Sequence, residues 1–435
     1  MADKAHIYNL KAVMNEVGLG PATLRAWERR YGLLKPQRSA GGHRLYSRKD
    51  IEMLKWLVER QKDGLSISQA VEMWKNQHGR EQERLGQSQV PYSNSYRGGT
   101  LLDELRRKWL SACMVFDDQA ANQVLDRAFA IAPAETICAE VLQKGLAEMG
   151  DRWYVGSASV QQEHFAATSS ALRINALLAA AISPYRHGHI LVACPPFEEH
   201  SLALLMVTYL LRRNGWDVVY LGENVPLQDL DSTLQLVSPE LVISAAQTLP
   251  GAASLRLMAE MTGHEGVNLA YGGGIFTRVP SASRSIPGFY LGNEIAQVPH
   301  MVEGLMIGPA PTLSVQEAQP AYTQVLAAFK KKAVLIGTQA LEAMKDQHPG
   351  AVHLEAASTD LNQHIQAALA LGDIQLLEQP IAWLDGLLKN YGISTEAIDG
   401  LFQAYTQALE SNLGGEGAVI TDFLKRRKPS SRRGS

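Results

Sequence analysis

Between residues 185 and 308 the chain alternates short apolar stretches with longer amphipathic ones. The apolar stretches are HILVACPP, WDVVYLG, ELVISAA, VNLAYGGG and GFYLG, with helical patterns between and after them. This alternation predicts a doubly wound α/β domain, in which helices cover both faces of a parallel sheet and ligands bind at the carboxyl ends of the strands. Its first predicted strand is followed by the loop CPPFEEH, which ends at His200.

The preceding segment, residues 100–184, has a different period. Its apolar residues recur at helical spacing in four stretches joined by short connections, which predicts a four-helix bundle. The third stretch contains Trp153 and the fourth contains the pair Glu163 and His164.

Residues 1–80 carry 15 lysines and arginines against 8 aspartates and glutamates, whereas the rest of the chain is acidic. Two short helices and a Gly-containing turn, followed by a basic hairpin around Gly41 and Gly42, predict a winged helix-turn-helix over residues 1–75. Charge of this kind is typical of DNA binding, although a solvated charged surface is the alternative. The candidate DNA contacts are Thr23, Arg25, Arg29, Arg30, Arg38, His43, Arg44 and Tyr46. The stretch ATLRAWERRYGLLKPQRSAGGHRLYSRKDIEML resembles the winged helix of MerR-type transcription regulators.

The remaining composition sets limits on the class of protein. Residues 76–99 are polar and aperiodic, which predicts a linker. Three cysteines without paired spacing give neither a disulfide framework nor a zinc signature. Because the N-terminus lacks an apolar signal region and no run is long enough for a membrane helix, we expect a cytoplasmic protein.

The last part of the chain, residues 313–424, is predicted to be helical, with Pro380 breaking or kinking its middle segment and Ser394 capping its last helix. Its role stays open between a degenerate second bundle and a dimerisation or partner-binding domain. Residues 425–435 are basic and rich in Ser, Gly and Pro, which predicts a disordered tail that adds non-specific attraction to DNA.

The CPPFEEH loop lacks the G-x-G-x-x-G pattern that cradles a dinucleotide phosphate. A neutral imidazole is a good transition-metal ligand, and a nearby carboxylate can fix the ring, so Glu198 and His200 are a candidate pair. From the residues alone, a solvated surface histidine is the favoured interpretation, and a metal ligand is the alternative.

The sheet domain resembles a cobalamin-binding domain with the motif Asp-x-His-x-x-Gly, a later Ser and a Gly-Gly. Here the motif reads Glu198-x-His200-x-x-Ala203, then Ser244, then Gly272-Gly273. The bundle resembles the cap of such proteins, and the order of the three parts resembles the CarH and LitR group of B12-dependent photoreceptor repressors. The resemblance implies adenosylcobalamin (coenzyme B12) as cofactor, with His200 as the metal ligand below cobalt. It implies that Glu198 orients His200, that Ser244, Gly272 and Gly273 line the nucleotide tail, and that Trp153, Glu163 and His164 lie above the corrin.

Three positions depart from that family pattern: Glu198 replaces Asp, Ala203 replaces Gly, and Tyr154 replaces a histidine that serves as the upper cobalt ligand after illumination. From the resemblance as a whole we expect a non-enzymatic, light-responsive repressor that binds operator DNA as a homo-oligomer, a dimer or a tetramer. Three alternatives remain open: a cobalamin sensor that ignores light, a corrinoid methyl carrier, and a regulator whose pocket has lost its cofactor.

Overall fold

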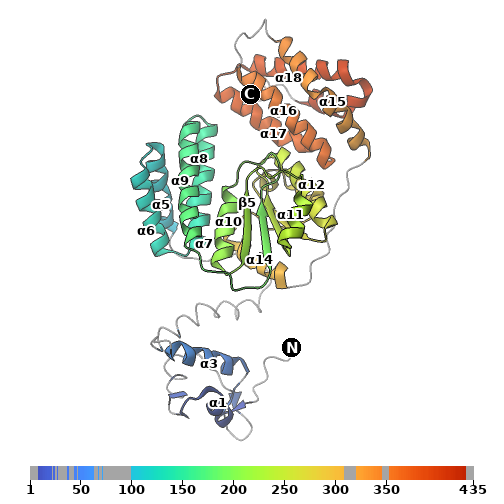
Figure 1. Cartoon of the computed structure of the whole chain (residues 1–435). Helices are drawn as coiled ribbons and strands as arrows, with labels where there is room; N and C mark the ends of the chain where they lie inside the picture. The colour runs from blue at the N-terminus through green and yellow to red at the C-terminus, as the bar shows by residue number, and fades with distance from the viewer. Residues whose placement is uncertain are drawn as a thin grey trace. The chain divides into compact units, whose positions relative to one another are not determined.

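The computed structural model describes parts of residues 8–71 and the segments 99–307, 320–344 and 352–427. The chain forms two compact units, residues 1–95 and residues 96–435 (Figure 1). Among the described residues, no helix is long and apolar enough to cross a membrane.

The first unit is a small helical domain with a three-stranded antiparallel sheet. Its described elements are β1 (Tyr8–Asn9), α1 (Leu10–Val17), β2 (Gln37–Arg38), β3 (Arg44–Tyr46) and α3 (Arg48–Lys62), with strand order β1-β3-β2. Gly18 ends α1 at a φ of 73°, because glycine adopts left-handed backbone without steric cost. Leu24 and Trp27, three residues apart and so on one face of a helix, are buried together in the core of this unit.

The second unit begins with four helical stretches that we call the bundle. They are α5 (Gly99–Met114), α6 (Asp118–Ile131), the run α7 (Ala134–Ile137), η1 (Cys138–Gln143) and α8 (Lys144–Tyr154), and α9 (Val160–Ala179). Ser159 starts α9 with a capping box, since its hydroxyl accepts from the Gln162 backbone and the Gln162 side chain bonds back. Trp109 is fully buried against Gly145, where a Cβ would lie 2.7 Å from the indole ring. The predicted bundle is therefore present, with a π-helical turn inside its third stretch.

The sheet domain follows the bundle and contains five parallel strands. They are β4 (His189–Ala193), β5 (Asp217–Gly222), β6 (Leu241–Ala245), β7 (Asn268–Gly272) and β8 (Phe289–Tyr290), in the order β5-β4-β6-β7-β8. The helices are α10 (Leu202–Arg213), α11 (Leu230–Val237), α12 (Leu249–His264), α13 (Ile275–Arg278) and α14 (Val298–Ile307), with short 3₁₀ turns η2 (Pro280–Ser285) and η3 (Ile295–Gln297). The predicted doubly wound parallel fold is confirmed.

The two faces of the sheet belong to different hydrophobic cores. On one face, Ile190 and Val192 of β4 share a core with α10, α14 and the bundle, which includes Trp109. On the other face, Leu191 shares a core with α11, α12 and the helices that end the chain. Figure 1 shows the bundle beside α10 and the later helices beside α12. Alternate residues of one strand therefore tie the sheet to two different helical layers.

The C-terminal helices are α15 (Pro320–Glu342), α16 (Val352–Leu371), η4 (Ile374–Leu377), α17 (Glu378–Asn390), α18 (Thr395–Leu413), η5 (Gly414–Gly417) and α19 (Ala418–Arg426). Phe329, Tyr405 and Ile365 are fully buried among them. Ser394 caps α18 through its hydroxyl, which accepts from the Ala397 backbone at 3.2 Å, as predicted.

Two predictions in this region are wrong. The break in the middle segment falls at Gly372, which has a φ of 83°, and Asp373 caps the turn that follows. Pro380 lies in the first turn of α17, where a missing N–H leaves no hydrogen bond unmade. The disordered tail does not begin at residue 425, because α19 includes Lys425 and Arg426, and Arg427 pairs with Asp385 and Asp399. Residues 428–435 lie outside the described residues.

Candidate functional site

The candidate site lies where the chain reverses direction across the sheet. From β4 the chain passes to β5 on one side and then to β6 on the other side of β4, so a crevice opens between the carboxyl ends of β4 and β6. The loop after β4 carries Glu198 and His200, and Ser244 lies at the end of β6. The fold therefore brings these predicted site residues to one edge.

Glu198 is a buried carboxylate with four hydrogen bonds. One oxygen accepts from His200 Nδ1 at 2.6 Å and from the His200 backbone at 3.1 Å. The other accepts from the backbone N–H groups of Gln247 at 2.6 Å and Thr248 at 3.3 Å. The Glu198 side chain is 1% exposed, whereas the His200 side chain is 65% exposed. The buried carboxylate thus fixes the Nδ1 edge of the imidazole, and most of the ring is open to solvent.

This geometry assigns different roles to the two ring nitrogens of His200. Nδ1 donates to the carboxylate, so Nε2 is the nitrogen whose lone pair is available to a ligand. The hydrogen bond to Glu198 raises the pKa of His200 above its ordinary value of 6.5, and the charges of Glu198 and Glu163 add to that rise. A fixed, basic and accessible imidazole nitrogen is a good donor to a transition metal.

The loop around this pair has strained backbone at two non-glycine residues. Phe197 has a φ of 64° and Asn224 has a φ of 48°. The Asn224 side chain accepts from the Phe197 backbone at 3.0 Å, and the Asn224 backbone donates to the Glu198 carbonyl at 2.9 Å. Such strain persists where surrounding contacts fix it, which is common at functional sites. Sequence reasoning missed Asn224, Gln247 and Thr248, although each lies within three residues of the carboxyl end of a strand in the parallel sheet.

The glycines after β7 have a local structural reason of their own. Gly273 has a φ of 120°, and a Cβ there would lie 2.0 Å from the Ala246 carbonyl oxygen. Gly272 pairs with Ala245, next to the buried Ser244, whose hydroxyl donates to the Ala193 carbonyl at 2.7 Å. Ser244, Gly272 and Gly273 therefore lie on adjacent strands at the same edge, with little side-chain bulk between them.

The bundle residues lie at the end of α8 and the start of α9. Glu163 is close enough to His200 for its charge to help raise that pKa, so the two side chains belong to one electrostatic environment. The His164 side chain is 75% exposed, and its Nδ1 lies 3.4 Å from a carboxylate oxygen of Glu163. Trp153 and Tyr154 both contact Trp383 of α17, with ring centroids 6.2 Å and 5.7 Å away. That contact with the C-terminal helices was not predicted from the sequence.

Other metal-binding chemistry finds little support in the part of the chain that the structure describes. It contains no group of three or more His, Cys, Asp or Glu side chains that could hold an ion. Burial raises the pKa of the Cys194 thiol to about 12, which keeps it protonated at neutral pH.

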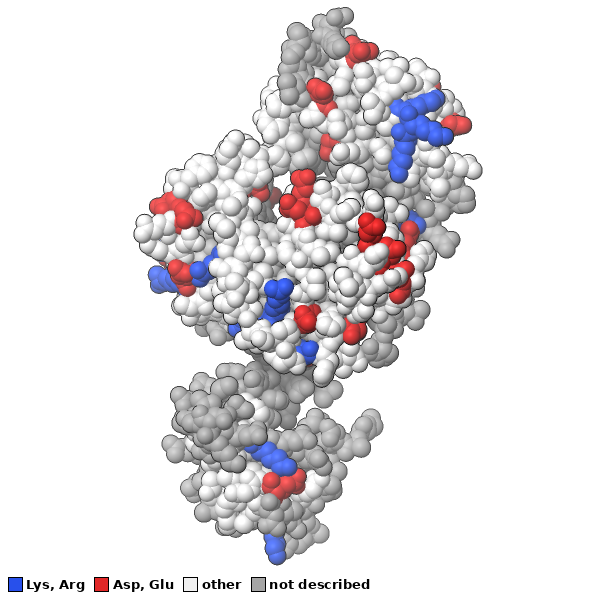
Figure 2. Space-filling model, in the orientation of Figure 1, with Lys and Arg blue, Asp and Glu red and all other residues white. Residues whose placement is uncertain are grey.

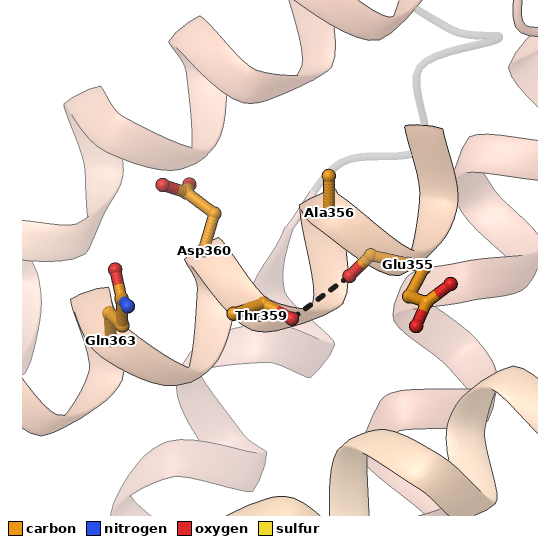
Figure 3. Close-up of a pocket in the computed structure, with 5 residues that line it drawn as sticks. All are labelled: Glu355, Ala356, Thr359, Asp360 and Gln363. Atoms are coloured by element: carbon orange, nitrogen blue, oxygen red, sulfur yellow. Dashed lines mark hydrogen bonds between the residues drawn. The ribbon is translucent and has the colours of Figure 1, made fainter. Parts of the chain in front are cut away.

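A separate depression of about 480 Å³ lies on α16 (Figure 3). It is lined by Glu355, Ala356, Thr359, Asp360 and Gln363. All five come from one helix, and the Thr359 hydroxyl donates to the Glu355 carbonyl of that helix. Groups on a single helix face do not converge on a ligand, so we assign no site there.

The predicted DNA contacts are only partly described. Thr23 is exposed, and Arg38 and Arg44 lie opposite each other in the β2–β3 ladder. Tyr46 is fully buried in the core of the first unit, so its prediction as a DNA contact is wrong; its ring is needed for packing. Arg25, Arg29, Arg30, His43 and the Gly41–Gly42 turn lie outside the described residues.

On the face in Figure 2, the coloured acidic and basic side chains of the larger unit are interspersed and form no continuous basic patch.

The small first unit, the helical bundle and the parallel sheet with a carboxylate-held histidine at its edge follow one another in the order expected of a DNA-binding regulator with a B12-binding part. The family model of the MerR HTH family regulatory protein matches residues 8–77, and that of the B12 binding domain matches residues 105–178. The chain is 33% identical over 248 residues to the HTH-type transcriptional repressor CarH of Myxococcus xanthus. The aligned region covers 56% of this chain and 79% of CarH. It is 31% identical to the repressor CarA of the same organism, over 54% of this chain and 74% of CarA.

The chain therefore belongs to the family of MerR-type transcription regulators with a B12-binding domain that includes CarH and CarA. The predicted resemblance is confirmed. Among solved structures, the monomethylamine corrinoid protein of Methanosarcina barkeri is 15% identical, with a TM-score of 0.40 over 48% of this chain and 100% of that chain. A likeness of that size carries no argument about function.

Proposed function

We propose that this regulator is a repressor that binds adenosylcobalamin and responds to light. The observation that carries the proposal is the Glu198–His200 pair, in which a buried carboxylate fixes Nδ1 and leaves Nε2 exposed at the carboxyl edge of the sheet. Nε2 of His200 would bind cobalt from below. When bound, adenosylcobalamin supplies a cobalt–carbon bond that light can break.

The other predicted residues have roles consistent with their positions. Ser244, Gly272 and Gly273 would line the nucleotide tail at the carboxyl edge that β6 and β7 share. Trp153, Glu163 and His164 of the bundle would lie above the corrin. Ala203 replaces the motif's glycine in the first turn of α10, where it is half-buried, which supports a site that tolerates the extra methyl group.

DNA binding would be the output of this site. The winged helix would contact operator DNA through Thr23, Arg25, Arg29, Arg30, Arg38, His43 and Arg44, and the active form would be a homo-oligomer. Light would change DNA affinity only if intact and light-cleaved adenosylcobalamin differ in how strongly they favour the oligomer that binds DNA over the form that does not.

The absorption spectrum of the purified full-length protein tests the proposal. We expect adenosylcobalamin to give a histidine-ligated spectrum with the wild type and to lose it with His200→Ala. His189→Ala is the matched control, because His189 lies 3.1 Å from Asp217 at the other end of the same β4 strand and is exposed like His200. A histidine-ligated spectrum that survives His200→Ala, or that His189→Ala also removes, contradicts the assignment.

One observation favours a second candidate, a cobalamin sensor that does not use light. Tyr154 occupies the position of the family's upper histidine ligand, and its hydroxyl donates to the Trp383 carbonyl at 3.3 Å. Its phenol is thus engaged by α17. Equal DNA binding by dark and illuminated cobalamin-bound protein would favour this candidate. The fused winged helix argues against a methyl carrier.

A further inference from the structure

The C-terminal helices are anchored on the sheet domain. Arg256 of α12 donates to the Ala370 carbonyl at 3.1 Å, and the Ser285 hydroxyl donates to the Leu371 carbonyl at 2.8 Å. Met258 of α12 and Ile365 of α16 are fully buried in one shared core. Because this contact combines apolar burial with hydrogen bonds to the end of α16, the C-terminal helices and the sheet domain form a packed whole.

From that anchor, α17 reaches the bundle. Figure 1 shows α17 near the end of α8. Trp383 stacks on Tyr154 at an interplanar angle of 25° and meets Trp153 at 40°. The Asn390 side chain donates to the Tyr154 carbonyl at 2.5 Å. Four side chains from two distant segments, Trp153, Tyr154, Trp383 and Asn390, therefore meet at the last two residues of α8.

Gly386 makes this fit possible. A Cβ on Gly386 would lie 1.9 Å from the Tyr154 hydroxyl oxygen, so the phenol rests against bare helix backbone. Glycine inside a helix costs about 1 kcal/mol relative to alanine, so its position here is accounted for by the close approach of Tyr154. The Tyr154 side chain therefore packs directly against the α17 backbone at Gly386.

The bundle residues held in this way are the ones next to the upper face of the proposed cofactor site. Trp153 is the proposed cover of the upper ligand, and Glu163 at the start of α9 acts electrostatically on His200. The C-terminal helices therefore join the two parts, because α17 contacts the end of α8 in the bundle and α16 is bonded to the sheet domain.

We propose that α17 is a latch in which Trp383, Gly386 and Asn390 position Trp153 and Tyr154 above the corrin. The latch holds the bundle closed over the sheet domain and makes the C-terminal helices sensitive to the size of the upper ligand. Trp383 is a positioning residue, because it acts through Trp153. This inference rests on the proposed binding of cobalamin between the bundle and the sheet domain.

Dark release of cobalamin from the full-length protein tests the latch, with adenosylcobalamin and hydroxocobalamin as probes of large and small upper ligands. Trp383→Ala removes both ring contacts, and Gly386→Ala displaces the Tyr154 phenol. We expect each variant to release adenosylcobalamin faster by on the order of tenfold. The effect on hydroxocobalamin should be smaller, since less of the upper space is filled.

The matched control is Tyr391→Ala. Tyr391 directly follows α17 and stacks on His353 at 4.5 Å, among the C-terminal helices themselves. Its loss tests general damage to these helices and should leave both release rates unchanged. The latch is contradicted if folded Trp383→Ala releases both cobalamins at wild-type rates, if it accelerates the two equally, or if Tyr391→Ala matches its effect.

A second readout separates this inference from the proposed function. In protein without cobalamin, hydrogen exchange of residues 144–154 should increase in Trp383→Ala and not in Tyr391→Ala. If the wild type binds no cobalamin, the proposed function fails, while increased exchange still supports the contact with α17. Unchanged exchange in Trp383→Ala overturns the latch whatever the cobalamin result.

Discussion

The carboxylate of Glu198 lies 2.6 Å from Nδ1 of His200 and is almost completely buried, while the imidazole is mostly exposed. The same carboxylate accepts from two backbone N–H groups at the start of α12. The orientation of His200 is therefore fixed by the sheet domain itself, before any cofactor binds. The predictions below follow from this and neighbouring contacts.

Glu198→Gln should weaken both the fold and cobalamin binding. Its amide keeps one oxygen and replaces the other with an NH₂ group, so two of the four backbone or ring N–H groups that now point at the carboxylate would face a donor. A buried donor without an acceptor costs about 1–3 kcal/mol. Urea unfolding measures that loss, and a cobalamin titration should show weaker binding. Glu199→Gln, at the exposed neighbouring position, is the control and should change neither by a comparable amount.

The pH dependence of the His200 ligand follows from its raised pKa. Protonation occupies Nε2, so the histidine-ligated spectrum should grow as pH rises. In the cobalamin-free protein the imidazole should titrate with a midpoint above 6.5, and competition from cobalt would lower that midpoint. The folded pKa lies above the unfolded one, so His200 stabilises the cobalamin-free fold fully below the unfolded pKa. That contribution is lost as pH rises through the folded pKa.

A pH titration of the apoprotein imidazole by NMR separates these effects. Glu198→Gln should move the His200 midpoint downward, because the charge and hydrogen bond that raise it are gone. A midpoint unaltered by Glu198→Gln would contradict the assigned cause.

Gly273→Ala should destabilise the sheet domain by about 2–3 kcal/mol, since a side chain would meet the Ala246 carbonyl in a left-handed backbone conformation. Gly266→Ala is the matched control, because Gly266 also has a positive φ, 73°, with no atom within 4 Å of an added Cβ. Its cost should be about 1 kcal/mol. Denaturant unfolding compares the two, and equal losses would contradict the close approach at Gly273.

Arg44 and Tyr46, two residues apart on β3, should separate DNA binding from packing. Tyr46→Ala empties a fully buried site and should destabilise the first unit by about 3–5 kcal/mol. Arg44→Ala should leave stability unchanged and reduce the salt dependence of DNA binding by about one ion. Hydrogen exchange of α3 and DNA titrations at several salt concentrations measure these effects. The DNA assignment fails if Arg44→Ala binds DNA like the wild type.

Much of the sheet domain and the bundle follows from apolar periodicity, because each strand and helix buries a regular set of side chains. His200 and Glu198 were predictable as a candidate pair from the loop after β4, but the distant backbone N–H groups that hold the Glu198 carboxylate were not. The donors to Glu198 come from Gln247 and Thr248, nearly fifty residues later, and only the strand order brings them together. Local pattern does not encode such a distant contact.

The same limit explains the error in the tail and the unforeseen contact of Tyr154 with Gly386. Arg427 was predicted to lie in the disordered tail, but it pairs with the distant Asp385 and Asp399. The error at Pro380 has a local cause. A proline in a helical pattern predicts a break, yet Gly372 ends the helix first and leaves Pro380 in a tolerated position. The contact between Tyr154 and Gly386 joins residues more than two hundred positions apart. Only the packing of the C-terminal helices on α12 makes that contact possible.

DNA binding measured on one preparation in three states tests the central claim most directly. Full-length protein without cobalamin, with adenosylcobalamin in the dark, and with adenosylcobalamin after illumination are compared by gel shift on candidate promoter DNA at one salt concentration. The account predicts strong binding only in the dark adenosylcobalamin state, and none of that gain in His200→Ala. Equal binding in all three states would contradict it.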